Sequence, residues 1–358
     1  MTDIVRAVDV GYGLTKYVTS ATDSHIKCAH FPSVAPLGGQ PEAAATLGAK
    51  RRTITIPVGN LLYEVGPDIH LADDITRSAH MHDAYCTTDE YLALLRGALR
   101  YMNLDHITLL VLGLPVSACR LYRAALERRS TGTHDPGRGR RVTIDSVKVL
   151  PQPQGALVHY GVDGHRLAQL RRERNLVIDA GSRTFDWLIS HGLGVIDKRS
   201  HSATRGMFDV LDTIAAGISR AKHTQFRDHE RIDRALRERT NPKVFGTEYD
   251  LSPHLPAAKK IAEEAVGEML RYVGDGSDVD HIVGVDPVSR TPDPLIWRCS
   301  RCLNLGRRIQ RNFATRSSNW RGLDGPSPRS LRSSSPRSRR SAIGLRRPTA
   351  MPANAPTG

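Results

Sequence analysis

The chain has 358 residues, a formal net charge of +14, 39% hydrophobic residues and only 5% aromatic residues. This length is enough to bury one or two sizeable cores, and the composition lies in the globular range. No apolar run approaches the roughly 18 residues that a membrane-spanning helix needs, and the N-terminus lacks the pattern of a secretory signal. Five scattered cysteines favour a reducing compartment. We therefore expect a cytoplasmic protein with no membrane partner.

The positive charge is concentrated at the C-terminal end. Residues 286–358 contain fifteen Arg, three Asp and neither Lys nor Glu, which gives a net charge of +12 in 73 residues. The preceding 285 residues carry only +2, as an ordinary globular protein does. Eleven Ser and nine Pro in the same segment predict a disordered tail over 286–358.

In chain order, the first strong pattern is a β-hairpin at the N-terminus. An apolar strand over 4–10 contains Asp9 near its end, a turn holds Gly11, Tyr12 and Gly13, and a second strand begins near Lys16. Glycines let backbone N–H groups approach a polyphosphate, and a carboxylate at a strand end can hold a hydrated Mg²⁺. A single Asp-x-Gly turn is more often only a turn.

The middle of the chain alternates helices and strands. A helix over 88–103 leads to a continuous apolar strand over 107–112, which indicates a mainly parallel sheet. Residues 130–141 have the composition of an exposed loop. A strand over 142–150 then runs into a helix whose first turn carries Gln152, and such a residue can orient a water molecule for attack on a phosphate.

A second hairpin over 177–188 repeats the first one. Asp179 takes the place of Asp9, 170 residues further along the chain, and Gly181 follows it two positions later. This offset is about the size of one domain, so the repeat predicts two similar domains, 1–163 and 164–285, that each contribute a turn to one nucleotide site. A loop over 197–205, a helix starting at Gly206, a helix over 257–273 and a strand over 279–285 complete the second domain.

This ordered set of motifs resembles the actin, Hsp70 and sugar-kinase superfamily. Residues 177–186 resemble its second phosphate motif, and residues 151–156 resemble its first connecting motif. Residues 9–16, 112–116 and 205–207 most resemble the ParM/StbA plasmid-segregation actins, and among these the actin-like protein D family of PRTRC systems. The resemblance spans about residues 4–284 and implies an α/β actin-like ATPase fold, two RNase-H-like domains around a nucleotide cleft.

The resemblance also implies a role for each matching residue. Asp9 and Asp179 would hold Mg²⁺ through water, and Gln152 would position the attacking water. The phosphates of ATP would lie between two sets of residues: Gly11, Tyr12, Gly13 and Lys16 on one side, and Gly181, Ser182, Arg183, Thr184 and Gly206 on the other. Such proteins polymerise with ATP, disassemble after hydrolysis and move plasmid copies through a DNA-bound adaptor protein. The implied partners are therefore other copies of the chain and an adaptor.

The chain departs from the family pattern at three places. Leu14 replaces a polar residue, Ser182 and Arg183 stand where many relatives carry more glycine, and no Gly-Gly pair follows the strand over 279–285. That pair belongs to the adenosine motif, and the composition changes at the same place. We interpret this coincidence as a shift of the reading frame near Gly284, which would replace the last strand and helices of the family.

Two other functions stay open. The arginine- and serine-rich stretch over 329–340 resembles segments that contact nucleic-acid phosphates, so the tail could bind nucleic acid non-specifically. A metabolic kinase of the same superfamily would need a catalytic Asp after the strand over 107–112, and residues 113–117 contain none.

Overall fold

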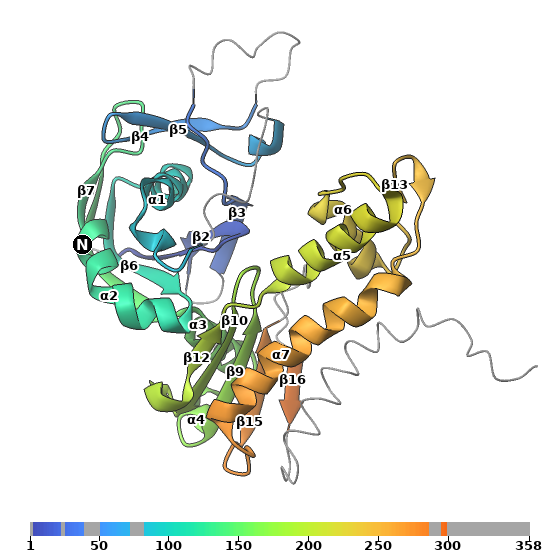
Figure 1. Ribbon diagram of the computed structural model, residues 1–358. Helices are drawn as coiled ribbons and strands as arrows, with labels where there is room; N and C mark the ends of the chain where they lie inside the picture. Colours follow the sequence, from blue (N-terminus) through green and yellow to red (C-terminus); the bar gives the residue numbers. More distant parts are fainter. Residues whose placement is uncertain (1–2, 23–25, 39–50, 72–81, 286–294, 299–358) are drawn as a thin grey trace, which may run out of the picture. The chain divides into compact units, whose positions relative to one another are not determined.

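The first sheet begins with the predicted hairpin. The computed structural model describes residues 3–22, 26–38, 51–71, 82–285 and 295–298 (Figure 1). The strand order in the first sheet is β3-β2-β1-β6-β8-β7, in which β1, β6 and β8 run parallel to one another. The strands are β1 (Val5–Val10), β2 (Leu14–Ala21), β3 (Ile26–Pro32), β6 (His106–Leu114), β7 (Gly132–His134) and β8 (Val142–Pro151).

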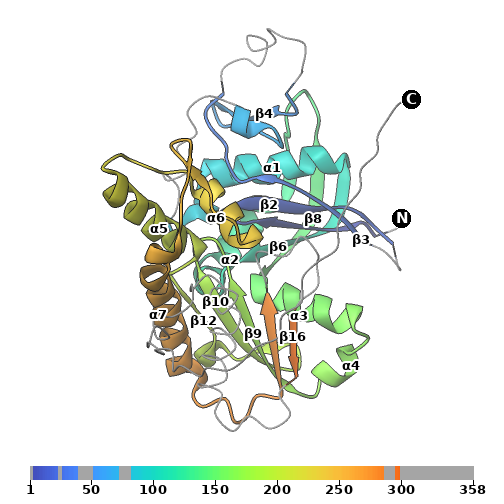
Figure 2. The ribbon, with the colours of Figure 1, turned by 90° about the vertical axis from the view of Figure 1, so that its right-hand side faces the viewer.

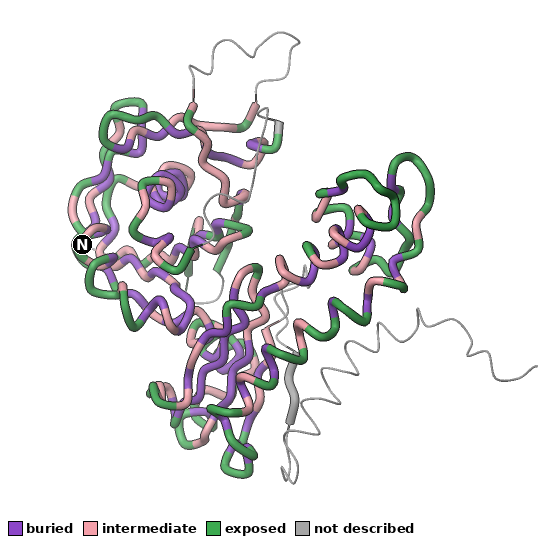
Figure 3. Tube along the Cα trace, in the orientation of Figure 1, coloured by how far each residue is buried: buried purple, intermediate pink, exposed green. Residues whose placement is uncertain are grey.

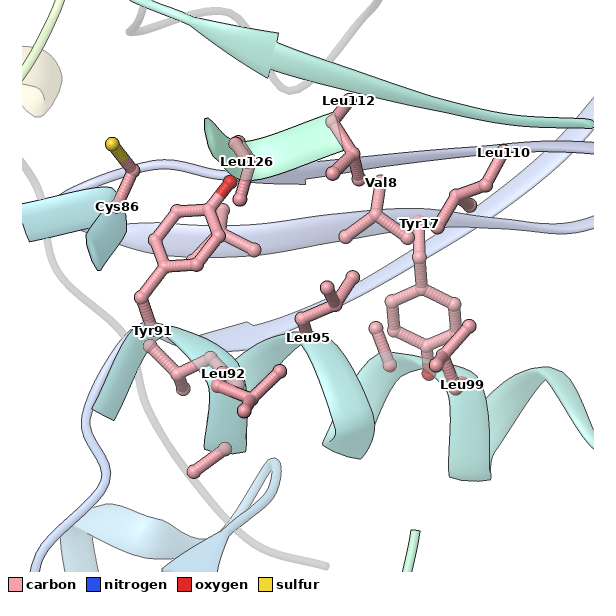
Figure 4. Close-up of a cluster of buried hydrophobic side chains, with 14 of the residues drawn as sticks. Val8, Tyr17, Cys86, Tyr91, Leu92, Leu95, Leu99, Leu110, Leu112 and Leu126 are labelled. Carbon is pink, nitrogen blue, oxygen red and sulfur yellow. The ribbon is translucent and has the colours of Figure 1, made fainter. Parts of the chain in front are cut away.

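Helix α1 (Asp89–Met102) covers one face of this sheet and confirms the helix predicted over 88–103. It begins where the Thr88 side chain accepts a hydrogen bond from the Tyr91 N–H, and it ends at Asn103, whose φ of 57° is left-handed. Figure 4 shows its apolar side chains pointing at the side chains of the strands. The hairpin of β4 (Ile54–Val58) and β5 (Leu61–Val65) also contacts α1.

Two further helices connect the first sheet to the rest of the chain. Helix α2 (Val116–Ser130) follows β6 and packs on β8. Helix α3 (Gln152–Asp163) follows β8 directly, as the sequence predicts, and its buried residues pack against the second sheet. Short 3-10 turns span Ile69–Leu71, Tyr85–Thr87, Asp197–Arg199 and Ser252–His254.

The second sheet repeats the hairpin arrangement of the first. Its order is β11-β10-β9-β15-β16, and β12 pairs in the antiparallel sense with residues 185–187 of β10. Strands β9 and β15 are parallel, whereas β16 pairs with β15 in the antiparallel sense. The strands are β9 (Arg174–Ala180), β10 (Phe185–His191), β11 (Gly194–Val195), β12 (His201–Ala203), β15 (His281–Val285) and β16 (Leu295–Arg298).

Helix α7 (Leu255–Val273) packs its apolar side on the second sheet, around Trp187. Figure 2 shows this helix beside β10 and β12. A separate apolar cluster joins α7 to α5 and α6. The remaining elements are α4 (Leu167–Leu170), α5 (Met207–Lys222), α6 (His229–Glu238), β13 (Lys243–Val244) and β14 (Thr247–Glu248).

Burial follows these layers. Buried positions concentrate on α1 and on the central strands of both sheets (Figure 3). All of the described residues belong to one compact unit of the chain. Within them, no helix has both the length and the hydrophobicity of a membrane span.

Two predicted loops are partly wrong. Strand β7 lies within 130–141, and β12 lies within 197–205. Both are three-residue strands that are held by pairing with a longer neighbour, so no local pattern marks them. Strand β16 falls at residues 295–298 of the predicted tail, and residues 286–294 and 299–358 lie outside the described residues.

Candidate functional site

The two hairpins bring their turns together. In the first, the Gly11 N–H donates to the Leu14 carbonyl oxygen at 3.2 Å. In the second, β9 and β10 pair in the antiparallel sense, from Ala180 opposite Phe185 to Arg174 opposite His191. A Cβ atom added to Gly13 would lie 2.9 Å from the Ser182 Oγ, so the first turn (residues 11–13) and the second turn (residues 181–184) touch.

Two carboxylates lie beside these turns, Asp9 on β1 and Asp179 on β9. The pKa of Asp179 is raised to about 7, first by burial and then by the negative charges of Asp186 and Asp9, against the opposing effect of Lys16. Burial also raises the pKa of Asp9, while Lys16 and a hydrogen bond from Gln152 act in the opposite direction. Two neighbouring carboxylates that resist ionisation provide a favourable place for a cation.

Gln152 is the first residue of α3, and its Nε2 donates to the Asp9 Oδ1 at 2.6 Å. The contact joins residues that are 143 positions apart. Gly113 makes it possible, because a Cβ there would lie 3.0 Å from the Gln152 Cγ and 3.2 Å from the Asp9 Oδ1. The predicted amide therefore stands next to the first carboxylate.

Lys16 pairs with Asp9 across the first hairpin. Its Nζ lies 4.0 Å from the Asp9 Oδ2, and its side chain is 62% exposed. The long, exposed side chain of Lys16 can move toward a negatively charged ligand while its backbone stays paired with Asp9 in the sheet.

Arg183, in the second turn, reaches across to the first turn. Its guanidinium carbon lies 5.8 Å from the centre of the Tyr12 ring, and its NH2 group lies 3.5 Å from the Asp83 Oδ1. Tyr12 stacks on Tyr85 with ring centres 5.3 Å apart. Burial raises the pKa of Tyr12 to about 12, so this phenol is neutral at physiological pH. The Nε of Arg183 is buried and has no hydrogen-bond partner among the described residues.

Gly206 places the start of α5 on the second turn. The N–H groups of Met207 and Phe208 donate to the carbonyl oxygens of Gly181 and Ser182, at 3.0 and 2.7 Å. A Cβ at Gly206 would lie 2.3 Å from the Arg183 carbonyl carbon, so only glycine allows this approach. The contact between the second turn and the start of α5 thus contains three of the predicted site residues, Gly181, Ser182 and Gly206.

The side chain of Thr184, at the end of the second turn, contacts Asp186. It is buried, and its Oγ1 donates to the Asp186 Oδ2 at 2.6 Å. Asp186 also accepts from the backbone N–H of Val116 and from the Ser202 hydroxyl. Sequence reasoning assigned Asp186 no role. The available signal was its place two residues after the turn, opposite Asp179.

The residues present fit a magnesium nucleotide. Two adjacent carboxylates suit a cation that keeps most of its water ligands, and Mg²⁺ usually binds through one or two carboxylates together with substrate phosphates. The glycines of both turns leave the backbone accessible, and Lys16 and Arg183 supply positive charge. Asp9, Asp179, Gln152, Lys16 and both turns therefore meet as one site.

Comparisons with known proteins agree with this architecture. Residues 7–155 match the model of the N-terminal domain of actin like proteins. Among solved structures, the archaeal actin homologue Ta0583 is 20% identical with a TM-score of 0.62, and the match covers 79% of this chain and 86% of that chain. Ta0583 has also been crystallised in complex with ADP. No curated protein sequence matches significantly.

Two further neighbours show the same arrangement. The ParM of a 15-stranded filament from Clostridium botulinum is 17% identical with a TM-score of 0.59, covering 80% of this chain and 89% of that chain. The actin-like protein Alp7A is 11% identical with a TM-score of 0.59, covering 90% of each chain. The chain therefore has an actin-like α/β fold, as the sequence predicts.

Proposed function

We propose that the protein is an actin-like ATPase of the ParM type, which binds Mg-ATP at the two turns, hydrolyses it and assembles into filaments. The observation that carries the proposal is the meeting of two equivalent turns, each with its own aspartate, beside Gln152. An isolated Asp-x-Gly turn carries no such weight, because most of these turns are only turns.

In this proposal, each group at the site has one task. Asp9 and Asp179 hold the water-ligated Mg²⁺, and backbone N–H groups of both turns with Lys16 and Arg183 bind the phosphates. Bound ATP supplies the phosphoanhydride bond that is cleaved. Gln152 orients the attacking water through its amide, which needs no shifted pKa for this work. Its bond to Asp9 fixes the amide next to the cation site.

Self-association is the second part of the proposal. It is supported by the fold shared with a ParM whose filament has been solved. Plasmid segregation through a DNA-bound adaptor, and the narrower assignment to the PRTRC actin-like proteins, rest on the sequence motifs alone. The predicted nucleic-acid contact of the tail concerns residues outside the described part of the chain.

The test is Mg-ATP binding and sedimentation of the full chain beside a version that ends at Val285. Binding by both forms, with pelleting that requires ATP, is the expected result. Absence of nucleotide binding in both forms would reject the proposal. ATP turnover that depends on an added sugar or carboxylate would instead indicate a metabolic kinase. Salt-sensitive DNA or RNA binding that disappears with residues 286–358 would assign that activity to the tail.

A further inference from the structure

We propose that Asp186 is a positioning residue: its buried carboxylate binds the start of α2 and so fixes the second turn against the half of the protein that carries Asp9 and Gln152. The consequence for hydrolysis rests on the proposed function. The coupling itself rests on hydrogen bonds between segments about 70 to 85 residues apart.

Helix α2 begins without a cap from its own sequence. Its N-cap residue is Pro115, which has no side-chain oxygen and makes no capping hydrogen bond. The first N–H groups of a helix have no partner inside the helix and need acceptors from elsewhere. A polar N-cap side chain usually supplies one. Here the acceptors come from the other half of the protein.

Asp186 supplies the first acceptor. Its Oδ1 accepts from the Val116 N–H at 2.8 Å, and the residue is only 1% exposed. The hydroxyl groups of Thr184 and Ser202 also donate to this carboxylate. Three donors and the positive end of a helix compensate a carboxylate that would otherwise be costly to bury.

Ser202 and Ser117 make the second link. The Ser117 N–H donates to the Ser202 Oγ at 3.0 Å, and the Ser202 N–H donates to the Ser117 Oγ at 3.1 Å. The Ser117 Oγ also lies 2.8 Å from the His201 Nδ1. Since the Ser202 hydroxyl itself donates to Asp186, both links converge on one carboxylate.

Both ends of this connection lie next to the proposed site. On one side, Asp186 stands opposite Asp179 in the register of β9 and β10, and Thr184 belongs to the second turn. On the other side, α2 follows the end of β6, where Gly113 makes room for Asp9 and Gln152. A movement of the second turn relative to α2 would therefore change the distance between the two carboxylates that hold the cation.

The charge and two-fold acceptor capacity of Asp186 suit this position. A carboxylate can accept from several donors at once, whereas Asn offers one acceptor oxygen and Ala offers none. We expect Asp186→Asn to keep part of the connection and Asp186→Ala to lose it. Ser190→Ala is a matched control, because Ser190 is also a buried polar residue of β10 but its described side-chain contact is with Asn175 of the same half.

The first experiment measures amide hydrogen exchange at residues 116 and 117 in the nucleotide-free protein. Asp186→Ala is expected to accelerate exchange there roughly tenfold, Asp186→Asn less, and Ser190→Ala not at all. Ser202→Ala, which removes the acceptor of the Ser117 N–H and one donor to Asp186, serves if Asp186→Ala fails to fold. Unchanged exchange at both amides in Asp186→Asn and Ser202→Ala would overturn the proposal.

The second experiment measures Mg-ATP hydrolysis and Mg-ADP binding by the same variants. A positioning role predicts that kcat falls roughly tenfold or more in Asp186→Ala, that the affinity for Mg-ADP changes much less, and that Asp186→Asn recovers part of kcat. Equal kcat values in Asp186→Ala and Ser190→Ala would overturn the effect on hydrolysis. If the unmodified protein binds no nucleotide, the proposed function fails, while the exchange rates still decide whether Asp186 couples the two halves.

Discussion

In the first half of the molecule, β1, β6 and β8 lie parallel, and α2 carries the chain from β6 back to the start of β8. In the second half, β9 and β15 lie parallel, but the next strand, β16, runs antiparallel to β15. The two halves are therefore equivalent through the hairpins and the first parallel strand, and they differ after Val285.

The length of the connection explains the difference. Two parallel neighbours need a crossover of a dozen or more residues, usually with a helix. Between β6 and β8 the chain has that length and forms α2. Between β15 and β16 there are only residues 286–294, so the chain can return only in the antiparallel sense.

This comparison locates the change in the chain. The sequence loses Lys and Glu from residue 286 onward, which is also where the second half stops following the first. The shift of reading frame near Gly284 stays a prediction, and resequencing that finds no Gly-Gly motif in another frame would remove it. Every described residue of the proposed site lies before this position.

Substitution of either aspartate, one from each hairpin, should cause the greatest loss of activity. Asp179→Ala and Asp9→Ala should each lower the rate of Mg-ATP hydrolysis roughly 100-fold or more, because each removes one of the two carboxylates of the proposed cation site. The measurement is phosphate release at saturating Mg²⁺, with Asp105→Ala, an exposed position, as the control. Full activity in either variant would contradict the equivalence of the two hairpins.

Truncation of a large side chain in either apolar core should cause the next largest change, a loss of unfolding free energy. Trp187 in the second half and Leu112 in the first are both almost fully buried. We expect Trp187→Ala to cost about 3–5 kcal/mol and Leu112→Ala about 2–5 kcal/mol of unfolding free energy. Among the described residues, most of the buried apolar side chains of the first half form one continuous cluster, whereas those of the second half divide among several.

Denaturant unfolding with hydrogen exchange tests this difference between the cores. Trp187→Ala should lower protection in α7 while α1 stays protected, because the two helices pack on different sheets. Equal loss of protection in α1 and α7 would show that the halves unfold as one unit.

Glycine-to-alanine substitutions at the contacts of the two turns should cause smaller losses of stability. Gly206→Ala should destabilise the protein by about 1–3 kcal/mol, because its Cβ would meet the backbone of Arg183 and Ser182. Gly13→Ala should cost less, because its Cβ would meet only the end of the flexible Ser182 side chain. Thermal melts can rank the two variants.

Gly267→Ala is the matched control for these glycine substitutions. Gly267 is exposed in the middle of α7 with no atom close to an added Cβ, so alanine there should raise stability by about 0.5–1 kcal/mol. Equal melting temperatures for Gly206→Ala and Gly267→Ala would contradict the close approach of α5 to the second turn.

The smallest change in stability should come from two aspartates that are paired with arginine, one in each half. Arg52 holds the pKa of Asp68 at about 2 in the first half, and Arg199 with Arg174 lowers the pKa of Asp278 in the second. A lowered folded-state pKa contributes stability that is present above the unfolded value near 3.8 and is lost as the pH falls through the folded value.

Asp68→Asn should therefore reduce the loss of stability between about pH 4 and pH 2, and Asp278→Asn should reduce the loss as the pH falls below the unfolded value near 3.8. Asp278→Asn should have the larger effect at neutral pH, still below about 1 kcal/mol, because Asp278 joins two arginines from different segments. Parallel pH–stability curves for the variants and the unmodified protein would contradict this assignment.

The elements that depend on neighbouring residues could be predicted from the sequence. The two hairpins follow from strand patterns interrupted by glycine, α1 follows from its apolar spacing and the Thr88 cap, and Gln152 falls at a helix start because the Pro at the second position favours one. The sequence also placed the change of composition at the residue where the two halves diverge.

Which of these elements contact one another depends on the tertiary structure. The bond from Gln152 to Asp9, the contact of Arg183 with Tyr12 and the cap that Asp186 provides for α2 each join residues far apart in the chain. The partner of a buried polar group is set by the packing of sheets and helices rather than by its sequence neighbours. The same reason explains why β7, β12 and β16, whose strand geometry comes from pairing with a longer strand, have no signal of their own.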